Sequence, residues 1–144
     1  MSSVEQPDVS SVEQVEQANA ELYGAFEAGD VDRMESVWDD VEPEALVCVH
    51  PGWPMLRGRS AVLRSWSAVM AGTDYIQFFL TDVQVSMHGA TAVVSCTENV
   101  LTSADVGENA AVVATNVFVQ RADGWRLQVH HGSPVLGRLA QEDR

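Results

Sequence analysis

The sequence predicts an α+β domain in which three helices come first and a run of long antiparallel strands follows. The first part repeats apolar residues every three or four positions, which is typical of amphipathic helices. The second part alternates apolar and polar residues over runs of about 12 residues, longer than the usual strand. Asp123-Gly124 joins the last two runs and is a strong hairpin signal. Helices segregated from an antiparallel sheet define the α+β class.

The first helix is expected over residues 12–28, where one face carries Val12, Val15, Asn19, Leu22 and Phe26. Gly29 should end it, since glycine adopts the left-handed conformation at a helix C-terminus at little cost. Asp30 should then cap a second helix that buries Val31, Met34, Val37 and Trp38. A third helix is expected over residues 59–70, ended by Gly72.

Strands are expected at residues 45–50, 75–87, 90–102, 110–121 and 125–134. Pro51 and Pro54 place a loop after the first of them, because proline donates no backbone hydrogen bond. A polar loop is expected over residues 103–109. Long strands twist, so a sheet of this length should curl and, closed by the helices, enclose a cavity.

The chain of 144 residues is expected to form one domain over residues 11–136, with a flexible lead-in at 1–10 and a polar tail at 137–144. No apolar run approaches the roughly 18 residues of a membrane span. The first residues are polar and acidic, unlike a signal peptide, so the cytoplasm is the expected location. Cys48 and Cys96 lie in apolar runs and are expected to be buried thiols.

The net charge of −13 argues against two classes of partner. Nucleic acids and anionic membranes both select cationic surfaces, so neither is expected to bind. Residues 1–44 alone carry a net −12, either on solvated helix faces or on an acidic docking surface. The chain contains no lysine, which excludes Schiff-base and P-loop lysine chemistry.

Three motifs in this order of elements resemble a known superfamily. They are AGD (28–30), HPGWPMLRGR (50–59) and DGWRLQVHHGSP (123–134), and they are similar to motifs of the nuclear-transport-factor-2-like (NTF2-like) superfamily, closest to its SnoaL-like domains. The resemblance implies a cone, with a curved sheet wrapped around a long N-terminal helix and a pocket for a hydrophobic small molecule. It implies homodimers in many members, and functions that range from isomerases, cyclases, epoxide hydrolases and dehydratases to non-catalytic association domains. We expect no cofactor and no metal.

Three residues are candidates for acid/base catalysis. His50 ends a strand beside a loop, where ketosteroid isomerases of this superfamily carry an Asp-Pro base instead of His-Pro. Glu98 lies on the apolar face of its strand, where burial would raise its pKa. His131 should face inward with Leu127 and Val129 and find a partner in Glu98 or else Asn116, while His130 should face outward. The alternative is a purely structural role for each.

Five residues are candidates for ligand binding: Tyr23, Trp53, Trp66, Phe79 and Asn116. Trp53, Trp66 and Phe79, together with Phe78, could line a pocket for a flat apolar ligand, or could belong to the core. Asn116 lies where ketosteroid isomerases carry an acid that helps to hold an oxyanion. The tyrosine of that site matches Leu22, so Tyr23 should be turned away by about 100° and strict isomerase activity is not expected.

Three functions stay open on the sequence: a proton-transferring enzyme, a small-molecule binding module and an association domain. Convergence of His50, Glu98 and His131 on one cavity would favour the enzyme. A homodimer is expected through the outer sheet face, on which Val112, Gln120 and Gln128 should lie.

Overall fold

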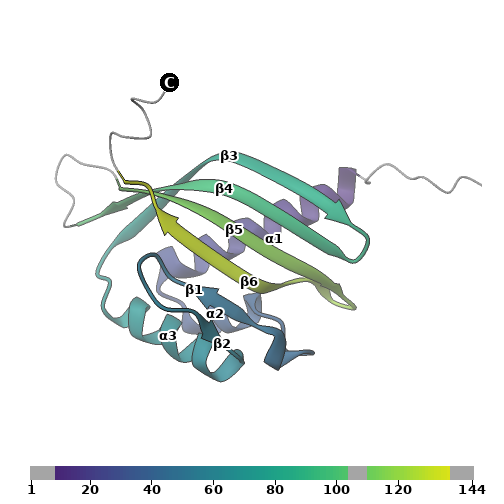
Figure 1. The fold of residues 1–144 in the computed structure, drawn as a ribbon, viewed down its shortest axis with the longest axis horizontal. Helices are drawn as coiled ribbons and strands as arrows, with labels where there is room; N and C mark the ends of the chain where they lie inside the picture. Colours follow the sequence, from purple (N-terminus) through teal and green to yellow (C-terminus); the bar gives the residue numbers. More distant parts are fainter. Residues whose placement is uncertain (1–8, 104–109, 137–144) are drawn as a thin grey trace, which may run out of the picture.

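The computed structural model describes residues 9–103 and 110–136, and these form the expected α+β architecture of three helices and one curved sheet (Figure 1). The helices are α1 (Val9–Ala28), α2 (Val31–Val37) and α3 (Arg59–Ala71), with a short 3-10 turn, η1 (Pro43–Ala45). The strands are β1 (Val47–Val49), β2 (Leu56–Arg57), β3 (Ile76–His88), β4 (Thr91–Thr102), β5 (Ala110–Arg121) and β6 (Gly124–Pro134).

The sheet has six strands in the order β2-β1-β6-β5-β4-β3. The four long strands form an antiparallel meander, as expected, but β1 pairs with β6 in parallel, so the sheet is mixed. β1 comes before the meander in the chain, yet it pairs with β6, the last strand of the meander. In Figure 1, α1 runs along the face of the long strands, while α2 and α3 lie at the β1–β2 end.

The core lies between α1 and the inner face of the sheet. Its fully buried side chains include Val15 and Leu22 from α1 and Val94, Phe118 and Leu127 from the strands. The helix starts three residues earlier than expected, because apolar spacing marks only the turns that pack on the core. Of the predicted lead-in and tail, residues 1–8 and 137–144 lie outside the described residues, as does 104–109 of the polar loop.

The junction between the first two helices follows the prediction. Gly29 has φ +64°, the left-handed conformation, and the Asp30 side chain accepts a hydrogen bond from the backbone N–H of Arg33. Gly29 therefore ends α1, and Asp30, the next residue, caps the start of α2.

A β-bulge in β6 reverses the predicted orientation of its second half. Val117 pairs with Val129 but Phe118 pairs with Leu127, which leaves Gln128 as an extra residue. Trp125 and Leu127 therefore face inward as expected, whereas beyond Gln128 the alternation is reversed.

The prediction that His131 faces inward and His130 outward is therefore wrong. His130 is 3% exposed on the inner face, and His131 is exposed on the outer face. The period-2 rule fails here because one extra residue moves every later side chain to the other face.

A polar cluster holds the bulge in place. The Asp39 carboxylate is fully buried and accepts two hydrogen bonds from Arg121, each 2.8 Å long. This ion pair holds the pKa of Asp39 well below its usual range. Gln128, the bulge residue, donates to Asp39 and to Glu42. The bulge thus directs the Gln128 side chain into this cluster.

The outer face of the sheet also differs from the prediction in one position. Val112 is buried, because it shares the inner face of β5 with Asn116, and the exposed valine is Val113. Both cysteines, Cys48 and Cys96, are buried free thiols, as predicted. Within residues 9–103 and 110–136, no helix is both long and apolar enough to cross a membrane.

Candidate functional site

A cavity of about 330 Å³ lies between the C-terminal half of α1, α3, the loop after β1 and the inner face of the sheet. Its lining residues come from seven segments of the chain: Tyr23, Phe26, His50, Pro51, Trp53, Trp66, Val69, Thr73, Ile76, Phe78, Glu98, Val100, Ala110, Val112 and His130. Most of these side chains are apolar, and the few polar ones come from α1, β4, β6 and the segments that follow β1 and α3. The cavity is therefore an apolar chamber with a small polar region.

Aromatic rings form much of the wall. Phe26 packs edge-on against Trp66 at 5.3 Å between ring centroids and lies 5.4 Å from Phe78. Phe78 faces the cavity, as expected, whereas Phe79, which was also expected there, is 54% exposed on the other side of β3. Alternation along a strand sends only one of two neighbouring phenylalanines inward. The prediction that Phe79 lines the pocket is wrong.

Glu98 places a carboxyl group inside this chamber. It is 4% exposed, and its Oε2 accepts a hydrogen bond of 2.6 Å from the Tyr23 hydroxyl. Burial raises the pKa of Glu98 to about 7, although the Tyr23 hydrogen bond opposes this by stabilising the charged form. The partner expected from the sequence was a histidine, but the observed partner is this tyrosine. Glu98 therefore changes charge near neutral pH.

Asn116 connects the polar groups of the site. Its Nδ2 donates to Asn19 Oδ1 at 2.8 Å and to the Tyr23 hydroxyl at 3.1 Å, and its Oδ1 lies 2.6 Å from His130 Nδ1. The expectation that Tyr23 is turned away is wrong, since the curved sheet wraps around α1 and brings both residues into the interior. A continuous chain of hydrogen bonds therefore runs from His130 through Asn116 and Tyr23 to Glu98.

His50 lies at the end of β1, buried between two indole rings. Its ring centroid is 4.8 Å from that of Trp53 and 4.7 Å from that of Trp66, both edge-on. Its Nε2 lies 2.9 Å from Ser65 Oγ, which donates its own proton to the carbonyl of Val62. His50 Nε2 must therefore carry a hydrogen, which leaves Nδ1 as the acceptor. Desolvation lowers the pKa of His50 to about 4, so the ring is neutral at pH 7.

His130 is the cavity residue that the sequence reasoning missed. Because Asn116 Nδ2 is a donor to two other groups, its Oδ1 accepts from His130, whose Nδ1 carries the hydrogen and whose Nε2 is the acceptor. Desolvation lowers the pKa of His130 to about 3. No local sequence signal marks it, because the bulge at Gln128 that turns it inward is a feature of strand pairing. His131 instead lines a groove on the outer face of the sheet, with Val113, Thr115 and Ser133.

The structure therefore brings together His50 and Glu98 of the three predicted catalytic residues, and replaces His131 by His130. Of the predicted ligand-binding residues, Tyr23, Trp53 and Trp66 line the cavity, and Asn116 lies directly behind it. Within residues 9–103 and 110–136, no group of three or more His, Cys, Asp or Glu side chains is arranged to hold a metal ion.

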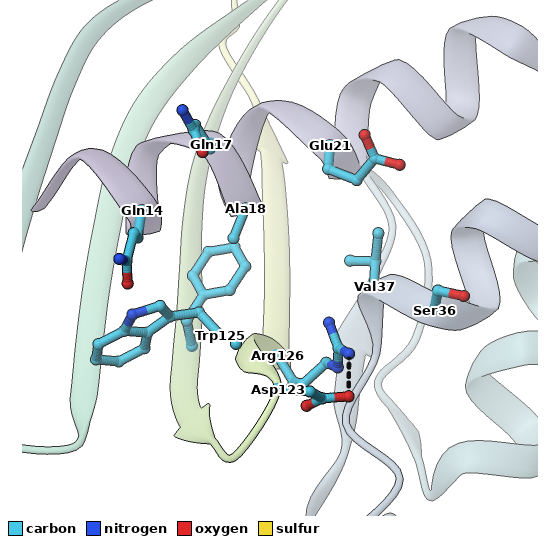
Figure 2. Close-up of a pocket in the computed structure, with 11 residues that line it drawn as sticks. Gln14, Gln17, Ala18, Glu21, Ser36, Val37, Asp123, Trp125 and Arg126 are labelled. Atoms are coloured by element: carbon cyan, nitrogen blue, oxygen red, sulfur yellow. Dashed lines mark hydrogen bonds and ion pairs between the residues drawn. The ribbon is translucent and has the colours of Figure 1, made fainter. Parts of the chain in front are cut away.

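A larger hollow of about 550 Å³ lies on another side of the molecule, between α1, α2 and the β5–β6 turn (Figure 2). The acidic and basic side chains that line it, Glu21, Asp123 and Arg126, are engaged in ion pairs, Glu21 with Arg33 and Asp123 with Arg126. None of its lining residues combines burial with a titratable group, so the smaller chamber is the better candidate for chemistry.

A curved sheet wrapped around a long N-terminal helix is the architecture of the NTF2-like class of proteins. The model of the SnoaL-like domain family matches residues 15–137, and the chain belongs to that family. The similarity covers all of the cavity residues described above.

Several solved structures are similar. One is described as a "putative dehydratase from the NTF2-like family" from Streptomyces avermitilis; it is 51% identical, with 89% of this chain and 98% of that chain covered and a TM-score of 0.83. A "putative calcium/calmodulin-dependent protein kinase type II association domain" from Thiobacillus denitrificans is 31% identical, with 84% and 94% covered and a TM-score of 0.76. The CaMKII hub of S. rosetta is 25% identical, with 90% and 100% covered and a TM-score of 0.72. No protein of curated function matches the sequence.

Proposed function

We propose that this protein is an enzyme that transfers protons on an apolar small molecule held in the chamber, and that its reaction is a dehydration. One observation carries the proposal: a buried carboxyl group, Glu98, lines the same apolar cavity as two neutral imidazoles and has a pKa near 7. A group that titrates near the working pH is available in both its acid and its base form. His50 supplies an acceptor nitrogen that is unprotonated at neutral pH.

The proposed step uses these groups as a general acid and a general base. Protonated Glu98 gives its proton to a departing hydroxyl group, and Nδ1 of His50 takes a proton from the neighbouring carbon. The C–O and C–H bonds break, a C=C bond forms, and one water molecule leaves. The imidazolium then returns its proton to Glu98, which restores the starting state. Both proton transfers are assigned to side chains of this chain, without a cofactor.

Tyr23 acts in this scheme as a positioning residue. Its pKa is raised far above its usual value by burial and by the neighbouring Glu98, so its hydroxyl stays protonated and continues to donate to the carboxyl group. This hydrogen bond fixes the Glu98 oxygen that faces away from the ligand. The other oxygen, Oε1, is then the one that exchanges a proton with the substrate.

The comparisons support dehydration over the other reactions of the family. The Streptomyces avermitilis protein that shares 51% of its residues with this chain is described as a "putative dehydratase". Two buried free thiols also suit a reducing compartment such as the cytoplasm, which we propose as the location.

The proposal is tested by incubating the protein with a panel of cyclic β-hydroxy ketones and measuring the loss of one water molecule by mass spectrometry. Turnover should fall about tenfold for each pH unit above about 7, because the acid form of Glu98 is lost. Glu98→Gln should abolish turnover, and Glu35→Gln, which removes the same charge from the exposed face of α2, should leave it unchanged. Full activity in Glu98→Gln would contradict the proposal, and ligand binding without turnover would favour a binding module.

We also propose that two copies of the chain associate through the outer face of the sheet. A groove of about 500 Å³ lies there, bordered by Val113, which is 47% exposed, and by His131. The association domain from Thiobacillus denitrificans, at 31% identity, supports self-association. Sedimentation at micromolar concentration should give a dimer for the wild type and a monomer for Val113→Glu. A wild-type monomer would contradict this proposal.

A further inference from the structure

The polar side chains of the chamber differ in which hydrogen-bonding atoms they leave free. His50 and His130 each use their N–H on a protein partner, Ser65 and Asn116 respectively. Each ring is therefore left with one unprotonated nitrogen, an acceptor. The two histidines are neutral, so these acceptors persist at neutral pH.

The hydroxyl groups of the lining are committed in the same way. Tyr23 donates its only proton to Glu98, and Thr73 donates its only proton to the carbonyl of Val69 at 2.7 Å. Neither hydroxyl has a hydrogen left for a ligand, although both keep a lone pair. Behind them, the two amide hydrogens of Asn116 are also both in use.

Glu98 is the one group among the described lining residues that changes its role. One of its oxygens is held by Tyr23, and the other accepts when the carboxyl group is ionised and donates when it is protonated. The indole N–H of Trp66 has no hydrogen-bond partner among the described residues, but its nitrogen is buried beside the Cys48 thiol and shielded from solvent. The remaining donor among these side chains belongs to Trp53, which is 42% exposed at the rim.

Among the described lining residues, no cationic side chain balances these acceptors. The chain has no lysine, and no arginine is among the described residues that line the chamber. A carboxylate or phosphate ligand would therefore enter an apolar cavity beside an ionised Glu98 with no compensating charge. The cost of leaving such a charge unpaired disfavours anionic ligands.

From this inventory we infer that the chamber selects a neutral ring compound that donates hydrogen bonds through two or more hydroxyl groups, and rejects the corresponding ethers and carboxylates. This inference rests on the proposed function only in that both place a small molecule in this cavity. The rings would pack against the wall formed by Phe26, Trp66 and Phe78, and the hydroxyl groups would point to His50, His130 and Glu98. At about 330 Å³ the chamber is at the small end of ligand pockets, which run from roughly 300 to 1,000 Å³, so a bicyclic compound is the appropriate size.

The test is isothermal titration calorimetry of the full chain with three ligands that share one skeleton: a naphthalenediol, its dimethyl ether and the matching dicarboxylate. At about pH 8, where Glu98 is mostly ionised, the diol should bind at least about tenfold more tightly than the ether, because two hydrogen bonds are lost in the ether. The dicarboxylate should show no binding. Equal or tighter binding of the ether or the dicarboxylate would overturn the inference.

Glu98→Gln gives a second, independent test. The amide oxygen can still accept from Tyr23, while the amide nitrogen turns an acceptor of the chamber into a donor. The preference for the diol over the ether should therefore shrink about tenfold in this variant and stay at the wild-type value in Glu35→Gln. An unchanged preference in Glu98→Gln would contradict the inference.

The outcomes separate the two proposals. A preference for the diol with no dehydration of any tested compound supports the inference and counts against the proposed reaction. A reversed preference, with turnover that depends on Glu98, overturns the inference and leaves the proposed reaction standing. Failure of all three ligands to bind would overturn the inference, and with it the proposal that this cavity binds a small molecule.

Discussion

The buried carboxyl group of Glu98 should make the protein less stable as the pH rises, and Glu98→Gln should remove that effect. The pKa of Glu98 is about 7 in the folded chain against 4.5 for an ordinary glutamate, so the folded state binds more protons between these values. Stability from this group is therefore present at low pH and is lost as the pH rises toward 7. Between about pH 5.5 and about pH 8.5 the loss amounts to about 2 kcal/mol of unfolding free energy.

The assay is urea unfolding followed by tryptophan fluorescence, at both pH values, for the wild type and for Glu98→Gln. His50 and His130 contribute with the opposite sign, because burial lowers their pKa values in the folded state. As the pH falls below 6.5, the unfolded state takes up protons that the folded state does not, which lowers stability. Both histidines are present in the variant, so their contribution cancels in the difference. The variant should gain about 2 kcal/mol relative to the wild type on going from the lower to the higher pH. Parallel pH dependences for the two proteins would refute the reasoning.

Three further substitutions test the surroundings of the site. Tyr23→Phe should raise the pKa of Glu98 further, because it removes the hydrogen bond that favours the carboxylate, and the alkaline limb of a pH–rate profile should move to higher pH. Arg121→Ala should cost about 3 kcal/mol in urea unfolding, since it leaves the Asp39 carboxylate buried without its cation; a loss below about 1 kcal/mol would show that the ion pair contributes little. Gly132→Ala should lower the thermal midpoint, because the added methyl group would meet a loop proline and a strand valine at 3.2 Å; an unchanged midpoint would mean that both neighbours move aside freely.

The order of helices and strands was predictable because its signals are local. Apolar spacing, Gly29 and Asp30 marked the helices, and the Asp123-Gly124 pair marked the last hairpin. Each signal depends on a few neighbouring residues and on no distant contact. The parallel pairing of β1 with β6 has no such local signal, because it joins segments that lie far apart in the chain.

The site was predictable only as far as side-chain alternation stayed regular. Glu98 lies on a strand segment without a bulge, and its inward direction follows from the period of two. The bulge at Gln128 is held by a polar cluster around Asp39, a distant contact, and so His131 was chosen where His130 is the buried residue. The direction of the Tyr23 side chain was predicted wrongly. The match of Leu22 to the tyrosine of related proteins compares positions along α1 only, whereas the curved sheet surrounds the helix and buries both residues.

The central claim is that Glu98 is a titrating group of a ligand-binding chamber, and carbon-13 NMR of its side-chain carboxyl group tests it most directly. The resonance, assigned by comparison with Glu98→Gln, should titrate with a midpoint near pH 7 in the free protein. Addition of the naphthalenediol should shift both the resonance and its midpoint, because the ligand touches the free oxygen. A midpoint near 4.5, or one that does not respond to the ligand, would contradict the account.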